Sequence, residues 1–364
     1  MSDSVGDTSV PDDARLMPAA LTEALRGSGA LASGRRVVAV RSQPLGSGKA
    51  MMSMLLRLHL EYDEPFAGPS TIVAKLACED PFRRSVADRF NFYDREVFFY
   101  ERLAPSMPFR VPGCHLAVMD PVSSTPVILL EDLGDLSVSQ TAGCAWEQAT
   151  LVAGELARFH AQWWGRTAAL ADDVHAVTSP SYLENVKGVF SESWPSCRRL
   201  AGDRISPELL AIGDRWADGV ADELVAEIAD PMTLCHGDLR LDNLRFVDGA
   251  LVVFDFQLLV RGNGVADLAY FASQSIPTPI RSGRDHELID LYLRQLARAG
   301  VQYDRRAAWQ AYRAATLFMF LFPVVLYKAF DELPPAGQDL AATMLDRSAA
   351  AIRDTQACSV VSGD

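Results

Sequence analysis

Three side chains with oxygen donors lie close together in the stretch HGDLRLDNLRFVDGALVVFDFQ. Asp238 and Asn243 precede a predicted β-hairpin, and Asp255 follows it. The dipeptide Asp248-Gly249 favours the positive φ angles of a two-residue turn, so the hairpin returns Asp255 to the neighbourhood of Asn243. A carboxylate and an amide at that place could share a divalent cation. Asp238 would then stand beside the metal as a base for a hydroxyl group.

The residues from Arg36 to Tyr62 predict a second hairpin, with a glycine-containing loop, LGSGK, at its tip. Gly46 and Gly48 have no Cβ atom, so the main-chain N–H groups there could approach a phosphate closely. A G-x-G sequence at a hairpin tip more often serves only to form the turn. The loop does not have P-loop spacing, and a strand follows it where a P-loop requires a helix.

Lys75 is the single charged residue in an apolar strand predicted over residues 71–77. The strand's alternation could turn its ammonium group to solvent, and a buried ammonium group would require an anion. The helix predicted over residues 90–105 favours the second possibility, because Glu96 lies on the same face as Phe92, Phe99 and Leu103. A carboxylate on the core side of a helix needs a cation, and we expect Lys75 to supply it.

A composition change near Gly134 predicts the boundary between two lobes. Before it, an apolar strand leads into Glu131-Asp132-Leu133; after it, long amphipathic helices begin. His160, in the helix of residues 146–164, is better explained as a buried histidine bonded to the main chain than as a catalytic group. Asp267 begins another helix, where it could stabilise the helix N-terminus or accept N–H bonds from the loop around Asp238.

The chain of 364 residues has a formal net charge of -13, with 49% hydrophobic and 22% charged residues. This composition predicts a soluble globular protein and argues against binding to nucleic acid or to an anionic membrane. Its six cysteines show neither a C-x-x-C pair nor metal-ligand spacing, which favours the reducing cytoplasm. The most apolar run, residues 314–327, contains Pro323, is too short to span a bilayer and is expected to form a buried helix.

Together, these motifs follow the order of glycine hairpin, strand lysine, helix glutamate, linker, H-G-D-x-x-x-x-N and D-F-Q. In this order the chain resembles the aminoglycoside phosphotransferase and choline kinase superfamily over residues 36–330. The D-F-Q motif and the following DLAYF segment look most like the ecdysteroid kinase-like group. The resemblance implies an α+β, bilobal protein-kinase-like fold with a small β-rich N-lobe and a larger, mainly helical C-lobe. The lobes are then an N-lobe (16–133) and a C-lobe (134–355). Composition outside them predicts a disordered tail over residues 1–15 and a second, polar tail over residues 356–364.

The resemblance also implies roles for the residues of the second lobe. Asp238 would be the catalytic base, or the positioning carboxylate, for the acceptor hydroxyl, and His236 would pack the loop. Asn243 and Asp255 would hold Mg²⁺ on the nucleotide phosphates.

In the first lobe, the resemblance implies that Lys75, paired with Glu96, grips the α- and β-phosphates of ATP. The glycine loop would cover the phosphates through Gly46 and Gly48. The main chain from Glu131 to Leu133 would bind adenine.

The predicted activity is therefore ATP- and Mg²⁺-dependent phosphorylation of a hydroxyl group on a small molecule such as an antibiotic, a sterol or an amino alcohol. Gln257 stands where protein kinases have a glycine, which argues against a protein-kinase activation switch. The alternative is a catalytically silent, kinase-like nucleotide-binding module. The motifs leave the acceptor, the choice between ATP and GTP and the oligomeric state open.

Overall fold

The computed structural model describes residues 13–45, 52–120, 124–134 and 138–361. The chain divides into unit 1, Met1–Met107 with Val111–Leu136, and unit 2, Pro108–Arg110 with Ser137–Asp364. The sequence placed this boundary near Gly134 and did not foresee that residues 108–110 belong to unit 2. They do so because the main chain of Arg110 accepts a hydrogen bond from Val253 N (3.0 Å), and Phe109 packs on Phe159 and Phe256.

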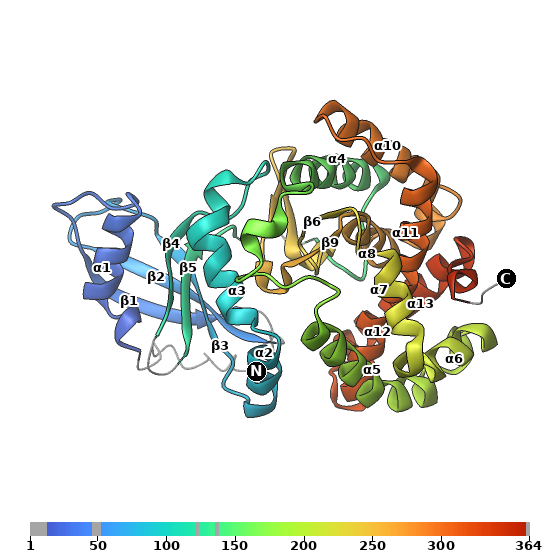
Figure 1. Cartoon of the computed structure of the whole chain (residues 1–364). Coiled ribbons are helices and arrows are strands. Elements are labelled where there is room, and N and C mark those ends of the chain that lie inside the picture. The colour runs from blue at the N-terminus through green and yellow to red at the C-terminus, as the bar shows by residue number, and fades with distance from the viewer. Residues whose placement is uncertain (1–12, 46–51, 121–123, 135–137, 362–364) are drawn as a thin grey trace. The chain divides into compact units, whose positions relative to one another are not determined.

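Unit 1 is built on one antiparallel sheet of five strands in the order β1-β2-β3-β5-β4 (Figure 1). The strands are β1 (Val37–Pro44), β2 (Ser53–Tyr62), β3 (Thr71–Ala77), β4 (Cys114–Met119) and β5 (Pro126–Glu131). The two strands of the hairpin predicted over residues 36–62 and the strand predicted over residues 71–77 are all present. The tip of that hairpin, with Gly46 and Gly48, lies outside the described residues.

Strand alternation gives this sheet two different faces. One face is an apolar core against helix α1 (Pro18–Gly27). Its buried members are Leu21, Leu25, Leu56, Leu58, Leu60, Ile72, Ala74, Leu76, Val127 and Leu129. Lys75 has the opposite parity to Ala74 and Leu76 and therefore points away from this core.

The helices after β3 bury a glutamate close to that second face. Helix α2 (Pro81–Arg89) precedes α3 (Phe92–Phe98), which continues through a wide turn (Phe99–Leu103) into a short 3₁₀ turn (Ala104–Ser106). Phe92, Phe99 and Leu103 are buried, as the sequence predicted, and Glu96 lies among them at 1% exposure.

The sequence predicted a disordered tail over residues 1–15, and the structure corrects this prediction for residues 13–15. A 3₁₀ turn covers Ala14–Leu16, with Asp13 accepting a hydrogen bond from Arg15 N and Leu16 fully buried. Arg15 also donates to the carbonyl oxygen of Thr125 at 3.1 Å. These bonds attach residues 13–15 to unit 1; residues 1–12 lie outside the described part.

Unit 2 is mainly helical, with two small antiparallel strand pairs. The pairs are β6 (Met232–Cys235) with β9 (Val260–Asn263), and β7 (Leu244–Val247) with β8 (Ala250–Val253). Its α-helices are α4 (Trp146–Trp163), α5 (Pro180–Leu200), α6 (Pro207–Asp214), α7 (Ala221–Glu227), α8 (Val265–Ser275), α9 (Thr278–Arg281), α10 (Asp285–Arg298), α11 (Arg305–Phe318), α12 (Leu321–Leu326) and α13 (Pro335–Asp354). Short 3₁₀ or π turns cover Thr167–Leu170, Gly202–Arg204, Trp216–Val220, Leu241–Asn243, Phe256–Leu258, Tyr327–Glu332 and Ala357–Val360.

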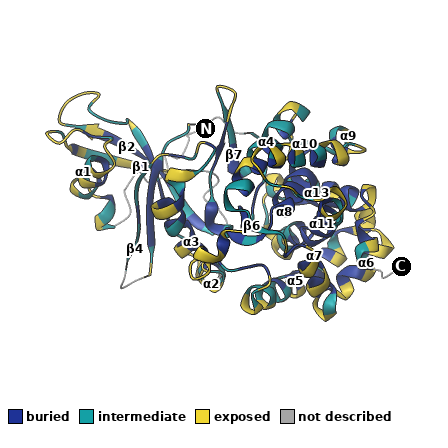
Figure 2. Cartoon of the chain, turned by 45° about the horizontal axis from the view of Figure 1, so that its top comes forward, coloured by how far each residue is buried: buried dark blue, intermediate teal, exposed yellow. Residues whose placement is uncertain are grey.

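Helix α8 is the centre of unit 2, because every one of its residues is buried (Figure 2). Helices α4, α11 and α13 pack against it. The run from Ala314 to Tyr327, expected to be a single buried helix, is divided between α11 and α12. Pro323 has no N–H group to donate to Met319, so the first helix cannot continue through it.

By length and hydropathy alone, the longer run Arg305–Glu332 would pass as a membrane span. Within it, 56% of the most apolar window is buried inside the protein, as in the core helices of globular domains. Such a run is weak evidence for a membrane segment.

The predicted C-terminal tail, residues 356–364, is also corrected up to residue 361. Ala357–Val360 form a 3₁₀ turn in which Ala357 and Cys358 are buried. Arg313 of α11 donates to the carbonyl oxygens of Thr355 (2.9 Å) and Gln356 (2.5 Å), which holds this end of the chain on unit 2.

One buried ion-pair network joins three helices of unit 2 and supports a prediction about stability. Arg281 of α9, 1% exposed, binds Asp285 of α10 and Asp354 of α13, each at 2.6 Å. Arg281→Met leaves the buried Asp285 without its cation, so the free energy of unfolding should fall by about 3–5 kcal/mol in urea titrations. Arg305→Met breaks an exposed pair of equal length, Arg305 with Asp290 at 2.6 Å, and should change stability little. Equal losses in the two variants would contradict the role of burial.

Candidate active site

The loop of residues 236–243, here called the HGD loop, connects β6 to β7 in unit 2. The hairpin that follows it turns at Asp248 (φ 51°) and Gly249 (φ 79°), as predicted. After β8, the N–H group of Phe254 donates to the carbonyl oxygen of Asn243 at 3.1 Å. The hairpin therefore does return Asp255, the next residue, to the neighbourhood of Asn243.

Asp238 is buried at the centre of this loop, with polar partners on both carboxylate oxygens. Its Oδ1 accepts a hydrogen bond from the Tyr270 hydroxyl (3.0 Å) and lies 3.4 Å from Nε of Arg240. Its Oδ2 accepts from Nδ2 of Asn243 at 3.0 Å. Burial raises the pKa of Asp238 above its ordinary value; the charge of Arg240 opposes this shift and that of Asp255 adds to it.

Asn243 and Asp255 offer the oxygen atoms that a hard divalent cation prefers. The Nδ2 group of Asn243 donates to the main-chain oxygen of Asp238 (2.8 Å) as well as to its Oδ2. Because both amide hydrogens are engaged, the side-chain oxygen of Asn243 is the atom available to a metal. Asp255 is half-buried, in a left-handed conformation (φ 68°), and a cation there would reduce its repulsion of Asp238. These residues therefore fit Mg²⁺.

Asp267, the third residue of α8, holds the main chain of the HGD loop. Its Oδ2 accepts from His236 N (2.6 Å) and its Oδ1 from Gly237 N (2.9 Å). Of the two roles considered for Asp267, the structure shows the attachment to the loop. Burial alone would raise the pKa of Asp267, but the hydrogen bond and charge of His160, the charge of His236 and the Gly237 N–H bond together lower it.

The two histidines near the loop are structural. His160 is fully buried, as predicted, but its ring binds Oδ2 of Asp267 (3.2 Å) and the Tyr292 hydroxyl (2.8 Å) instead of the main chain. His236 accepts the Asp238 N–H bond at Nδ1 (3.2 Å) and donates from Nε2 to the carbonyl oxygen of Phe254 (3.1 Å). These two bonds connect the HGD loop to the segment that leads into Asp255.

His160, Asp267 and Cys235 also bring possible metal-binding atoms within 4.8 Å of one another. Both ring nitrogens of His160 and both oxygens of Asp267 already have hydrogen-bonding partners. Burial raises the pKa of the Cys235 thiol well above its ordinary value, which disfavours the thiolate that a metal requires. Hydrogen bonds therefore account for this cluster without a metal.

Unit 1 contains the predicted pairing of Lys75 with Glu96, at 2.6 Å between Nζ and Oε2. Both side chains are buried, which excludes the solvated alternative for Lys75. The adenine-binding segment predicted at Glu131 to Leu133 is half-buried, and Glu131 N donates to the carbonyl oxygen of Gly113 at 2.7 Å.

Sequence reasoning missed an ion pair that fixes this segment. Arg57 of β2 binds Asp132 through Nε (2.7 Å) and NH2 (3.2 Å), and Asp132 also accepts from Gly134 N at 2.9 Å. The pair immobilises the middle of the predicted adenine-binding segment. The only sequence signal for it was Arg57 alternating with Leu56 and Leu58, a pattern that an exposed arginine also gives.

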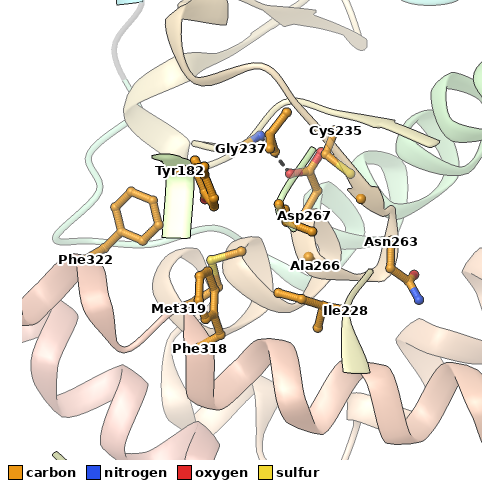
Figure 3. Close-up of a pocket in the computed structure, with 13 residues that line it drawn as sticks. Tyr182, Ile228, Cys235, Gly237, Asn263, Ala266, Asp267, Phe318, Met319 and Phe322 are labelled. Carbon is orange, nitrogen blue, oxygen red and sulfur yellow. Dashed lines mark hydrogen bonds between the residues drawn. The ribbon is translucent and has the colours of Figure 1, made fainter. Parts of the chain in front are cut away.

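A small pocket lies next to the HGD loop, within unit 2 (Figure 3). Its lining is mainly apolar and consists of Val177, Tyr182, Ile228, Cys235, Gly237, Val260, Gly262, Asn263, Ala266, Asp267, Phe318, Met319 and Phe322. The carboxylate of Asp267 is occupied by the loop, and the Asn263 amide binds the Asp230 carbonyl oxygen and the Tyr303 hydroxyl. A molecule entering the pocket would therefore meet mostly hydrocarbon and aromatic groups.

A comparison of the sequence with protein-family models shows which family the chain belongs to. The model of the ecdysteroid kinase-like family matches residues 47–302. The chain belongs to this family. No curated protein matches the sequence. Membership in a kinase-like family confirms both the predicted relationship and the predicted enzyme class, a small-molecule kinase.

Solved structures show the same fold at low sequence identity. A choline kinase from Cryptosporidium parvum is 13% identical, with a TM-score of 0.57 over 88% of this chain and 91% of that chain. For a putative aminoglycoside phosphotransferase from Ralstonia eutropha, the identity is 16% and the TM-score 0.53, over 92% and 98% of the two chains. An ethanolamine kinase from Plasmodium vivax is 13% identical, with a TM-score of 0.50 over 85% and 81%. The predicted α+β, bilobal kinase-like fold is confirmed.

Gly237 of the HGD loop and Gly249 of the hairpin turn have nearly the same φ angle. Replacing each by alanine therefore distinguishes the cost of backbone strain from the cost of a steric clash. A Cβ atom on Gly237 (φ +81°) would lie 2.0 Å from the Leu258 carbonyl oxygen, whereas one on Gly249 (φ +79°) would meet nothing within 4 Å. Gly249→Ala should cost about 1–2 kcal/mol of stability and leave activity unchanged. Gly237→Ala adds the clash and should displace the loop, remove activity and cost several times as much in urea unfolding. Similar behaviour of the two variants would show that the loop is not closely packed at Gly237.

Proposed function

We propose that this protein transfers the γ-phosphoryl group of ATP to a hydroxyl group of a small molecule, with Mg²⁺. The observation that carries the proposal is the arrangement of Asp238. Its buried carboxylate is fixed by Tyr270 and Asn243. Both amide hydrogens of Asn243 are engaged, which leaves its side-chain oxygen for a metal, and the main chain of Asn243 binds Phe254, the residue before Asp255. A base next to two oxygen ligands for a divalent cation is what phosphoryl transfer to an alcohol requires.

In the proposed reaction, the acceptor oxygen forms a bond to the γ-phosphorus, and the bond from this phosphorus to the β,γ-bridging oxygen breaks, releasing ADP. Asp238 orients the hydroxyl group and accepts its proton. Asn243 and Asp255 would hold Mg²⁺, which when bound neutralises charge on the phosphates. Arg240 lies between Asp238 and Asp242, and its charge favours the ionised form of the base.

Unit 1 would supply the nucleotide-binding groups. Lys75 would contact the α- and β-phosphates, and Glu96 would fix the direction of its ammonium group. The main chain from Glu131 to Leu133, which Arg57 and Asp132 immobilise, would bind adenine. Gly46 and Gly48 would cover the phosphates. Residues 16–133 remain our proposal for the nucleotide-binding lobe, and residues 134–355 for the catalytic and acceptor-binding lobe.

The acceptor would be a small molecule with an alcohol group. The similar folds with named activities include choline and ethanolamine kinases, and the family is named after ecdysteroids. The net charge of -13 supports a cytoplasmic protein that binds neither nucleic acid nor anionic membranes.

The direct test is a panel of alcohols incubated with the protein and Mg-ATP: choline, ethanolamine, an aminoglycoside and an ecdysteroid. ADP release, with mass spectrometry of the phosphorylated product, gives the readout. At least one acceptor should be phosphorylated. Binding of Mg-ATP without turnover of any acceptor or of water would instead identify a silent nucleotide-binding module.

Asp238→Asn should leave nucleotide affinity within about twofold of the wild type and lower kcat by about 10²–10⁴-fold, because the amide cannot accept the proton. Isothermal titration measures the affinity and ADP release the turnover. Asp248→Asn, at the exposed tip of the hairpin, makes the same chemical change outside the site and should have no effect. Unchanged turnover of Asp238→Asn would exclude its role as the base.

Asp255→Ala should remove one of the two protein ligands of the metal. Nucleotide affinity measured with Mg²⁺ should fall by at least about tenfold, whereas the affinity measured with excess chelator should equal that of the wild type. If the dependence of nucleotide binding on Mg²⁺ concentration were the same in both proteins, Asp255 would not be a metal ligand.

A further inference from the structure

Tyr270 is a residue of α8 whose hydroxyl group donates to Oδ1 of Asp238 at 3.0 Å. We propose that Tyr270 is a positioning residue for phosphoryl transfer: together with Arg240 it engages Oδ1, so that Oδ2 is the oxygen that receives the acceptor's proton. This inference rests on the proposed function of Asp238 as the base. It adds a residue that the sequence indicated only as part of an apolar helix.

The polar contacts of the carboxylate distinguish its two oxygens: each accepts one side-chain hydrogen bond, and Oδ1 also forms an ion pair with Arg240. Each carboxylate oxygen has two lone pairs that can accept hydrogen bonds. Oδ1 has the Tyr270 hydroxyl group at 3.0 Å and Nε of Arg240 at 3.4 Å. Oδ2 has Nδ2 of Asn243 at 3.0 Å. Oδ2 therefore has one polar partner and Oδ1 has two, so we assign Oδ2 to the hydroxyl group of the acceptor.

The position of the Tyr270 hydroxyl group is fixed by burial of the side chain and by the packing of its ring on Phe322. Tyr270 is 1% exposed, and its ring stacks on Phe322 of α12 with centroids 4.3 Å apart. Burial, followed by the negative charge of Asp238, raises the pKa of Tyr270 well above its ordinary value. The hydroxyl group thus remains protonated and remains a donor throughout the range in which kinases work.

Helix α8 supports the HGD loop at two further points, which makes the direction of Tyr270 part of a larger arrangement. Asp267, one turn earlier, holds His236 N and Gly237 N. Ser275, at the end of the helix, accepts from Leu241 N at 3.1 Å. One helix therefore fixes the main chain before and after Asp238 as well as its side chain.

In the transfer step, the proton of the acceptor hydroxyl moves to Oδ2 as the new oxygen–phosphorus bond forms and ADP departs. Oδ1 stays hydrogen-bonded to Tyr270 throughout, so the carboxyl group does not rotate while it receives the proton. Without that bond, the buried carboxylate can turn about its χ angles and Oδ2 is presented to the acceptor for less of the time.

A second buried tyrosine offers a matched control, because it makes the same kind of bond away from the site. The Tyr312 hydroxyl group of α11 donates to Oδ1 of Asp285 at 2.7 Å, and Tyr312 is also 1% exposed. Tyr270→Phe and Tyr312→Phe each remove one hydroxyl group from a buried tyrosine–carboxylate pair. Both substitutions should lower the melting temperature by a similar amount. Any difference in kcat between the two variants would then come from the contact of Tyr270 with Asp238.

The experiment measures ADP release from Mg-ATP, with water as acceptor and with each alcohol of the panel. In Tyr270→Phe, kcat should fall about 10–100-fold, the effect expected for loss of one hydrogen bond to a charged group, with the KM for ATP within about twofold of the wild type. Tyr312→Phe should keep the wild-type kcat. Equal kcat values in the two variants would overturn the proposal, as would a parallel change of kcat and KM in Tyr270→Phe.

Crystal structures of the two variants give a readout that does not depend on turnover. In Tyr270→Phe the Asp238 carboxylate should be rotated or present in two conformers; in Tyr312→Phe it should match the wild type. A wild-type protein that turns over neither water nor any alcohol would refute the proposed function. The Asp238 conformation would still decide the positioning role, since an unchanged carboxylate in Tyr270→Phe would overturn it.

Discussion

The hydrogen bonds from the main chain of the HGD loop to Asp267 are the constraint on which the rest of unit 2 depends. A main-chain loop that carries a buried carboxylate cannot obtain its N–H partners from water, so the protein must provide them. Asp267 provides two, to His236 and Gly237, and His160 in turn holds Asp267. Tyr292 completes the chain of hydrogen bonds by binding His160. Residues more than 130 positions apart in the sequence thus fix one short loop.

The fold arranges this support by burying a whole helix. Helix α8 has no exposed residue, and it is enclosed by α4, α11 and α13. Because the neighbouring helices fix the rotation and translation of α8, its polar side chains meet the loop at fixed positions. Asp267, Tyr270 and Ser275 lie on the side of α8 that meets the loop. The helix therefore determines where the carboxylate of Asp238 stands.

The sequence predicted those features that depend on local spacing. The turn at Asp248-Gly249, the strand with Lys75 and the burial of Glu96 follow from φ preference and periodicity, and the structure contains all three. The pairing of Lys75 with Glu96 could be predicted from the sequence, because opposite charges at core positions of neighbouring elements must compensate each other.

Features that depend on long-range packing were predicted poorly. Tyr270 lies in the apolar segment DLAYF, where an aromatic residue looks like core, and only the fold shows its hydroxyl group meeting Asp238. His160 was correctly expected to be buried, but its carboxylate partner is 107 positions away. The end of the chain looked like a polar tail because Arg313, which binds the carbonyl oxygen of Thr355, belongs to a helix 42 positions earlier. Local composition carries no record of such partners.

Charge at the HGD loop connects the structure with the overall acidity of the chain. Asp238, Asp242 and Asp255 stand near Arg240 in this part of unit 2, and Asp242 also lies near enough to Arg245 to act on its charge. Three carboxylates with two guanidinium groups have a net charge of about -1 if all are ionised, and burial strengthens the repulsion among the carboxylates. A divalent cation would balance that charge. A free nucleotide would be repelled by it, so the same carboxylates that favour the metal also favour the metal–nucleotide complex over the bare nucleotide. In the proposed reaction, the acidity of the loop would therefore favour the metal complex of the nucleotide as the phosphate donor.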